Sequence, residues 1–157
     1  MKKIAKLLVP VMFVLYLLAL TWVIVYKGNR DLLMYGGEPE YQQISFYLYF
    51  NGRETLLNIA AFIPTGLFLM LMGKNGKVFG AGIIAFLISL AFEAAQYILM
   101  VGTSDLTDLI TNTLGGVIGI AVFCLCQRIW HEKTRSILSW LCIPATIAFC
   151  FVSVYLV

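Results

Sequence analysis

Residues 89–119 of the chain read SLAFEAAQYILMVGTSDLTDLITNTLGGVIG, two apolar segments joined by a very short connection. Five acidic or amide side chains interrupt the apolar pattern: Glu93, Gln96, Asp105, Asp108 and Asn112. Polar groups cost free energy in hydrocarbon, so a membrane protein that keeps several together is expected to use them. The stretch therefore predicts a hairpin of two membrane helices with a polar interior.

The rest of the chain has the composition of a membrane protein. Of its 157 residues, 61% are hydrophobic and 12% are charged, and apolar runs of about 20 residues, the length that crosses a bilayer, recur along it. Five runs are predicted to span the membrane: residues 7–26, 56–72, 78–100, 106–127 and 137–157. They leave one sizeable loop, residues 27–55, and no room for a soluble catalytic domain. The sequence thus predicts an all-α bundle of about five transmembrane helices, folded as one domain over residues 1–157.

Basic residues give the expected orientation, because cytoplasmic loops retain Lys and Arg. Eight of the eleven basic residues alternate onto one side of the predicted spans, and most acidic residues fall on the other. The eight are Lys2, Lys3, Lys6, Lys74, Lys77, Arg128, Lys133 and Arg135. We therefore expect a cytoplasmic amino terminus, an external carboxyl terminus and an outward-facing hairpin connection. The net charge of +3 does not indicate a nucleic-acid partner.

Helical spacing places the polar residues on facing surfaces of the hairpin. Asp105, Asp108 and Asn112 are three and four residues apart, so they project from nearly one helical face, and Glu93 and Gln96 share a face of the preceding helix. With a rise of about 1.5 Å per residue, Glu93 and Asn112 each lie about 10 Å below the outer ends of their helices. We therefore predict two polar rungs, Glu93 opposite Asn112 and Gln96 opposite Asp108.

A carboxylate at the depth of Glu93 is costly unless it is protonated, hydrogen-bonded or paired with a cation. Arg53 and Asn58, at the outer end of the preceding span, are the expected partners: Arg53 supplies positive charge and Asn58 a hydrogen bond to either carboxylate. Amides alone often only hold helices together. Three acids with little compensating base favour a binding site, and Glu93, Asp105 and Asp108 are candidate oxygen ligands for a divalent cation.

Two sets of residues are interpreted as architectural. Gly115 and Gly119 form a small-residue face that lets another helix approach closely. Pro64 and Gly66 predict a kink in the second span, because proline leaves a backbone carbonyl without its helical partner.

The segments outside the hairpin give weaker indications. Residues 35–39 are typical of a turn, and the aromatic residues among 44–50 predict a loop lying on the outer leaflet, with a substrate-contacting lid as the alternative. His131, the only histidine, is interpreted as an interfacial loop residue. The four cysteines fall in the last two spans and are expected to behave as small apolar groups.

Three blocks of sequence resemble the signature blocks of the VanZ-like membrane proteins. They are NIAAFIPTG at residues 58–66, EAAQ at 93–96 and GTSDLTDLITNTLGG at 102–116. The matching positions are Asn58, Pro64, Gly66, Glu93, Gln96, Asp105, Asp108, Asn112, Gly115 and Gly119. Where several relatives have an arginine before the first aspartate, this chain has Thr103 and Ser104, so the acidic hairpin lacks a local counter-ion.

The resemblance implies a bacterial plasma-membrane protein of the cell envelope, associated through the founding member with low-level resistance to the glycopeptide teicoplanin. It brings no established catalytic mechanism. Our leading hypothesis is a non-catalytic protein whose outward polar pocket binds a membrane lipid or lipid-linked cell-wall precursor and lowers glycopeptide access. Two alternatives stay open: a metal-dependent membrane enzyme acting on a lipid phosphate, and a small proton- or ion-coupled transporter with Glu93 as the carrier.

Overall fold

The computed structural model describes residues 2–35, 44–45, 47–73, 78–99 and 104–155. Its helices are α1 (Lys2–Tyr35), α2 (Gly52–Met72), α3 (Val78–Leu99), α4 (Leu106–Trp130) and α5 (Thr134–Tyr155), with the short 3-10 helix η1 (His131–Lys133) before α5. Two two-residue strands, β1 (Ile44–Ser45) and β2 (Ser104–Asp105), pair in parallel. The predicted helical class is confirmed.

Among the described residues, three segments are long and apolar enough to cross a membrane. They are α2, α3 and the continuous stretch Leu106–Val152, which contains α4, η1 and most of α5. In α1 the apolar stretch is shorter and covers Leu7–Val23. The second and third predicted spans therefore match single helices, while the fourth and most of the fifth lie in one long apolar segment that turns at η1.

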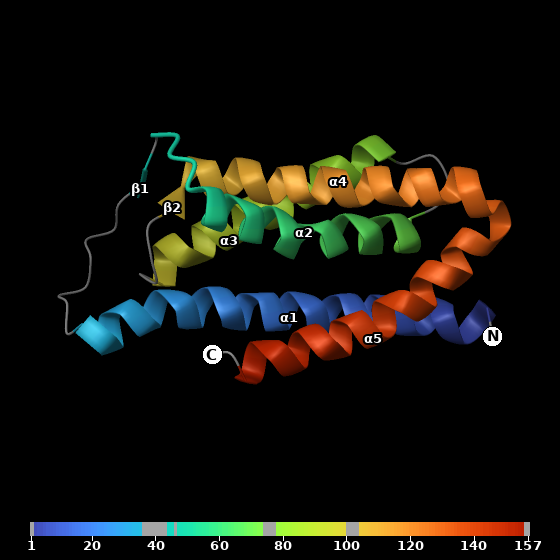
Figure 1. The fold of residues 1–157 in the computed structure, drawn as a ribbon, viewed down its shortest axis with the longest axis horizontal. Helices are drawn as coiled ribbons and strands as arrows, with labels where there is room; N and C mark the ends of the chain where they lie inside the picture. The colour runs from blue at the N-terminus through green and yellow to red at the C-terminus, as the bar shows by residue number, and fades with distance from the viewer. Residues whose placement is uncertain (1, 36–43, 46, 74–77, 100–103, 156–157) are drawn as a thin grey trace.

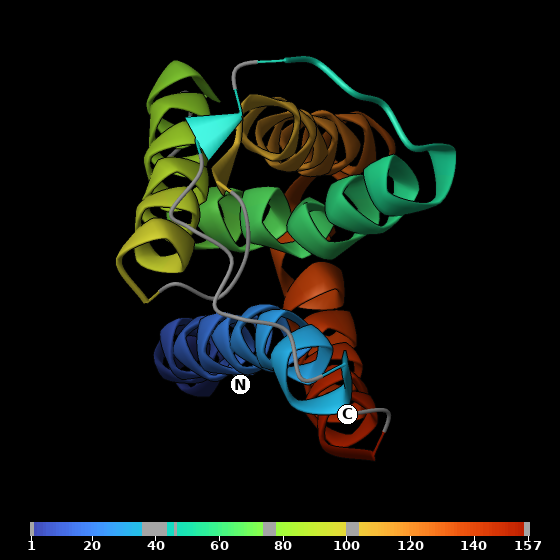
Figure 2. The same ribbon diagram turned by 90° about the vertical axis from the view of Figure 1, so that its left-hand side faces the viewer.

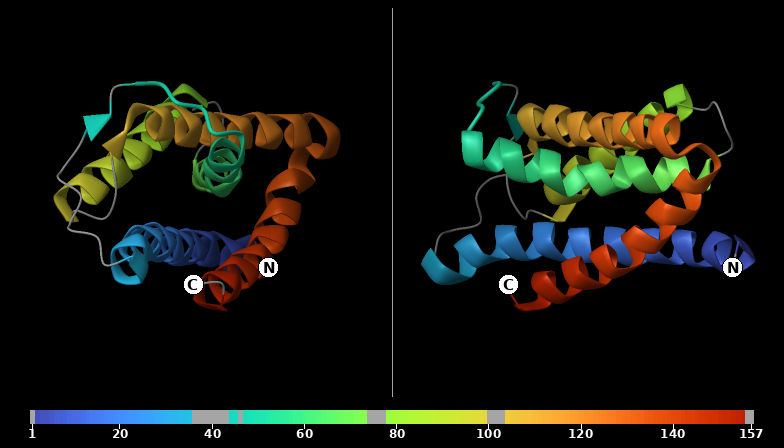
Figure 3. Two further views of the ribbon diagram at one scale, coloured as in Figure 1. Left: turned by 60° about the vertical axis from the view of Figure 1, so that its left-hand side comes forward. Right: turned by 45° about the vertical axis from the view of Figure 1, so that its right-hand side comes forward.

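The helices form two layers (Figure 1). One layer contains α2, α3 and α4, with α2 lying along α4 in the most extensive contact of the molecule. The other contains α1 and α5, which lie side by side beneath it (Figure 2). From the far end of α4, α5 slants across to reach α1 (Figure 3). The hairpin of α3 and α4 is thus one part of a three-helix layer.

Aromatic side chains join the two layers. Tyr16 of α1 is only 2% exposed, and its hydroxyl donates a hydrogen bond to the carbonyl oxygen of Ala61 in α2. The Tyr16 ring lies 5.1 Å from that of Phe149 in α5, measured between centroids, and Phe13 lies 5.4 Å from Phe68 in α2. These aromatic contacts are the part of the core where α1, α2 and α5 meet, and the core continues into α3 and α4 through Ala85 and Phe123.

Close contact between α2 and α4 depends on glycine. A Cβ atom added to Gly66 would run into the carbonyl oxygen of Gly116, and one added to Gly119 would run into that of Ile63. A Cβ on Gly115 would meet Ile59 in the same way and lie 2.9 Å from the Cβ of Phe62. Gly66, Gly115 and Gly119 thus all lie where the two backbones touch, and α2 stays helical through Pro64.

The helices on both sides of the predicted loop, residues 27–55, extend beyond the predicted spans. Helix α1 continues to Tyr35, and α2 begins at Gly52. The N-cap of α2 is Asn51, whose side chain accepts a hydrogen bond from the Arg53 N–H at 3.3 Å. Apolar runs end where the polarity of the sequence changes, whereas helices end where the backbone is capped. The predicted turn at residues 35–39 lies outside the described residues after Tyr35.

Candidate functional site

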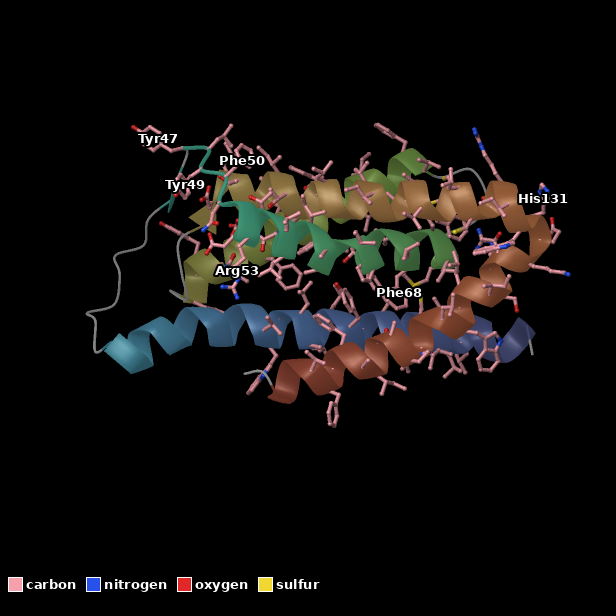
Figure 4. The ribbon with its side chains drawn as sticks, in the orientation of Figure 1. Tyr47, Tyr49, Phe50, Arg53, Phe68 and His131 are labelled. Atoms are coloured by element: carbon pink, nitrogen blue, oxygen red, sulfur yellow. The ribbon has the colours of Figure 1, made fainter. Side chains whose placement is uncertain are left out.

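A polar cluster lies at the end of the bundle where α2 and α4 begin. In Figure 4 the label of Arg53 marks this end, and the label of His131 marks the opposite end. Glu93 of α3 is only 4% exposed, and its Oε2 atom accepts a hydrogen bond from the backbone N–H of Asp105 at 3.0 Å. A buried carboxylate needs donors, and the first N–H groups of a helix lack partners within it. The start of α4 therefore supplies a hydrogen-bond donor to Glu93.

Asp105 closes the beginning of α4 with its side chain as well. It is the N-cap residue, and its Oδ1 atom accepts a hydrogen bond from the N–H of Thr107 at 2.8 Å. Carboxylates are favoured in this position by the partial positive charge of a helix N-terminus. The sequence predicted Asp105 as a site residue; the structure gives this side chain a capping contact.

Asn58 and Asp108 link α2 to α4. The Asn58 side-chain amide donates to the Asp108 Oδ1 atom at 2.7 Å, the short distance typical of a bond to a charged acceptor. Asn58 was expected to hydrogen-bond one of the hairpin carboxylates, and Asp108 is that carboxylate. The contact draws a third helix into the cluster.

The two predicted rungs of the hairpin are wrong in register. Ser89 of α3 donates to the carbonyl oxygen of Leu109 at 3.2 Å, and Glu93 meets Asp105. The two helices are antiparallel, so a step of four residues forward on α3 matches a step of four residues back on α4. Asn112 therefore lies deeper in the bundle than Glu93. The prediction assumed that α3 ends and α4 begins at the same depth, whereas α3 extends beyond the first residue of α4.

The remaining predicted site residues lie around these contacts. Asn112 is buried within α4, and Gln96 is half-buried on α3, one turn beyond Glu93. Arg53 is exposed at the start of α2, and among the described residues its guanidinium forms no ion pair with a cluster carboxylate. The expected positive partner for the acids is therefore not Arg53 in this conformation.

The segment from β1 to Tyr49 lies across the start of α4 and is called the strap. Strand β1 pairs with β2 so that Ile44 lies opposite Ser104 and Ser45 opposite Asp105. Farther along, the backbone N–H of Tyr49 donates to the Thr107 Oγ1 atom at 3.0 Å. Thr107 is only 3% exposed, while the rings of Tyr47, Tyr49 and Phe50 face outward (Figure 4). Hydrogen bonds of its backbone therefore hold the aromatic segment beside the cluster.

Sequence reasoning missed the hydroxyl groups that hold this arrangement. Ser89 is fully buried one helical turn before Glu93, and Thr107 lies between the two aspartates. Their spacing was the available signal, since residues four apart share a helical face. Threonine and serine are common in membrane helices, so the spacing alone did not single them out.

The carboxylates do not gather as a metal-binding group. Among the described residues, which include Glu93, Asp105 and Asp108, no three histidine, cysteine or acidic side chains come close enough to hold a metal ion. Each of the three acids instead has a hydrogen bond to a protein donor. A cation bound by all three acids remains a prediction, and this arrangement does not support it.

Apolar helices around a buried polar cluster define a helical membrane protein. The chain belongs to the VanZ/LLP1 family, whose model matches residues 13–127 and so includes the whole cluster. It is 32% identical over 133 residues to Protein VanZ of Enterococcus faecium, an alignment that covers 82% of this chain and 81% of that protein. No solved structure matches the chain. The family resemblance seen in the sequence is confirmed.

Proposed function

We propose that this chain is a non-catalytic protein of the bacterial plasma membrane that binds a membrane lipid or lipid-linked cell-wall component at the cluster of Glu93, Asp105, Asp108 and Asn58. One observation carries the proposal: Glu93 is 4% exposed, yet lies at an end of the bundle and is held by the N–H of Asp105. A carboxylate buried near an interface is retained at a cost, which favours a functional role.

The proposed topology has five spans, with the amino terminus in the cytoplasm and the carboxyl terminus outside. It is supported by the basic residues at the end of the bundle that contains η1, where Arg128, Lys133 and Arg135 lie. The cluster is at the opposite end, beside the first turns of α2 and α4. In this orientation the cluster meets the outer leaflet, where a lipid-linked precursor is exposed.

The chemistry of the cluster favours a ligand that donates hydrogen bonds. Carboxylate oxygens are acceptors with several lone pairs, so a carboxylate can accept hydrogen bonds from a ligand as well as from the protein. Ammonium, amide and hydroxyl groups of a headgroup or of a peptide-bearing precursor fit such acceptors. If the protein binds these donor groups of the ligand, teicoplanin-type glycopeptides would have less access to the cell surface.

The test compares teicoplanin and vancomycin susceptibility in a Gram-positive host that lacks this protein. The host carries an empty vector, the wild type, Glu93→Gln, Asp108→Asn or the control Glu132→Gln, at matched membrane levels. Glu132 is exposed in η1 at the other end of the molecule. We expect the wild type and Glu132→Gln to raise teicoplanin tolerance, and the two cluster variants to lose most of the increase. Equal susceptibility in all five strains would contradict the glycopeptide role.

A further inference from the structure

A second polar site lies at the end of the bundle away from the carboxylate cluster. Where α4 turns into η1, a hollow of about 400 Å³ is lined by Cys124, Gln127, Arg128 and His131. The hollow is open to the surface rather than enclosed. None of the lining residues is acidic, and three of them carry hydrogen-bond donors. The hollow therefore has the chemistry of an anion site.

Arg128 is the cationic group of this site. A guanidinium presents donors in a planar fork that matches the oxygens of a phosphate. Nearby Arg135 is committed to packing: it donates to the carbonyl oxygen of Leu71 at 2.8 Å, and its guanidinium carbon lies 5.6 Å from the centroid of the Phe123 ring. Arg128 makes no hydrogen bond or ion pair within the described part of the chain. The residues that line the hollow with Arg128 include no carboxylate.

His131 has an unusual backbone conformation at the same place. With φ of 45° and ψ of −119°, it is the one non-glycine residue of positive φ among the residues that the structure describes. Side chains beyond glycine rarely adopt this region, and strained residues cluster at binding sites. The chain thus places an imidazole, which donates a hydrogen bond in either protonation state, where a glycine would be relaxed.

The surroundings of the hollow indicate a lipid. On the same helix, Leu125 and Ile129 are 62% and 63% exposed, and Leu125 is three residues before Arg128, so an apolar surface for acyl chains adjoins the Arg128 edge of the hollow. Trp130 is also exposed, and tryptophan is enriched at the boundary between membrane and water. Basic pockets at such boundaries bind anionic headgroups. An acyl chain along α4 would bring a headgroup to Arg128 and His131.

We propose that this hollow binds the phosphate of an anionic phospholipid, with Arg128 as the bidentate donor and His131 and Gln127 as further donors. The site is separate from the carboxylate cluster and does not depend on the function proposed for it. Only its assignment to the cytoplasmic leaflet rests on the proposed topology. Binding by protein in detergent is the same for either orientation, so the two proposals can fail independently.

The experiment titrates the purified full-length chain in detergent with phosphatidylglycerol, phosphatidylcholine or inorganic phosphate, and counts bound lipid by native mass spectrometry. We expect one phosphatidylglycerol to bind preferentially over phosphatidylcholine, and Arg128→Gln to weaken it about fivefold to tenfold. Arg128→Lys keeps the charge but loses the fork, so we expect a loss of about threefold. The controls Lys133→Gln and Lys133→Arg alter a neighbouring basic residue that does not line the hollow, and we expect less than about twofold change for each.

His131→Gly separates binding from folding. Glycine relaxes the backbone but removes a donor, so we expect unchanged or higher thermal stability together with weaker phosphatidylglycerol binding. Equal binding of the two lipids, or wild-type affinity in Arg128→Lys and Arg128→Gln, would overturn the proposal. Displacement of the lipid by inorganic phosphate at equal concentration would show a free-phosphate site and overturn the lipid assignment.

Discussion

The side-chain amide of Asn58 donates a 2.7 Å hydrogen bond to Asp108, and this contact fastens α2 to α4 at the end of the bundle where Glu93 is buried. The two residues are 50 positions apart in the sequence. Their contact makes the acidic hairpin part of a three-helix site, and it is the first link to test.

Removing Asn58 should destabilise the contact between α2 and α4. We expect Asn58→Ala to lower the free energy of unfolding by about 1–2 kcal/mol, because a half-buried carboxylate loses a donor. Unfolding in mixed micelles measures the change. A double-mutant cycle with Asp108→Ala should give a coupling energy of about 1 kcal/mol. Additive effects of the two substitutions would contradict a direct contribution of this hydrogen bond.

The glycines between α2 and α4 should tolerate no side chain. We expect Gly66→Ala and Gly119→Ala each to cost about 2–3 kcal/mol, since the added methyl group meets the backbone of the facing helix. The matched control is Gly82→Ala in α3, where an added Cβ has no neighbour within 4 Å. Alanine there should be neutral or stabilise by up to about 1 kcal/mol. Equal losses at Gly66 and Gly82 would show that close packing against the facing helix does not decide the result.

Glu93 should be replaceable by glutamine without loss of the fold. Its carboxylate accepts the Asp105 N–H, and a glutamine oxygen accepts in the same way. We expect Glu93→Gln to remain within about 1 kcal/mol of the wild type, and Glu93→Ala to lose about 1–3 kcal/mol because the N–H is left without this acceptor. Unfolding in mixed micelles measures both variants. If glutamine were as harmful as alanine, the charge rather than the acceptor would hold the start of α4.

The strap should loosen when Thr107 loses its hydroxyl. Valine has nearly the same shape, so Thr107→Val removes the acceptor of the Tyr49 N–H while preserving packing. We expect hydrogen exchange of the Tyr49 amide to accelerate about fivefold to tenfold. The control is Thr113→Val, because the Thr113 hydroxyl donates to Leu109 within α4 itself. Exchange that is unchanged in Thr107→Val would show that the β1–β2 pairing alone holds the segment.

The extent to which the fold could be predicted differs from helix to helix. Residues 56–72 and 78–100 were predicted from their apolar runs, and α2 and α3 match them apart from a few terminal residues. The end of α1 at Tyr35 and the start of α2 at Gly52 were missed, because both lie in polar sequence. Hydrophobicity reports burial in lipid, and it does not report where hydrogen-bonded backbone stops.

The candidate site shows the same division. The expectation that Asn58 would bond a hairpin carboxylate is confirmed, because both residues were placed at the same end of the bundle. The rung between Glu93 and Asn112 is wrong, because the offset between α3 and α4 changes every partner along the hairpin. Composition cannot reveal an error of two helical turns in depth, but such an error changes which groups are close enough to form a hydrogen bond of 3.0 Å.

The sequence by itself determined the membrane class, the family and the residues of the polar cluster. These follow from properties that each residue carries with it, since the cost of placing a group in lipid depends on its own chemistry. Only the tertiary structure decided that Glu93 meets the backbone of Asp105, and that Thr107 holds the strap. Those contacts depend on the axial offset of packed helices, which is set by close packing and by directional hydrogen bonds between distant parts of the chain.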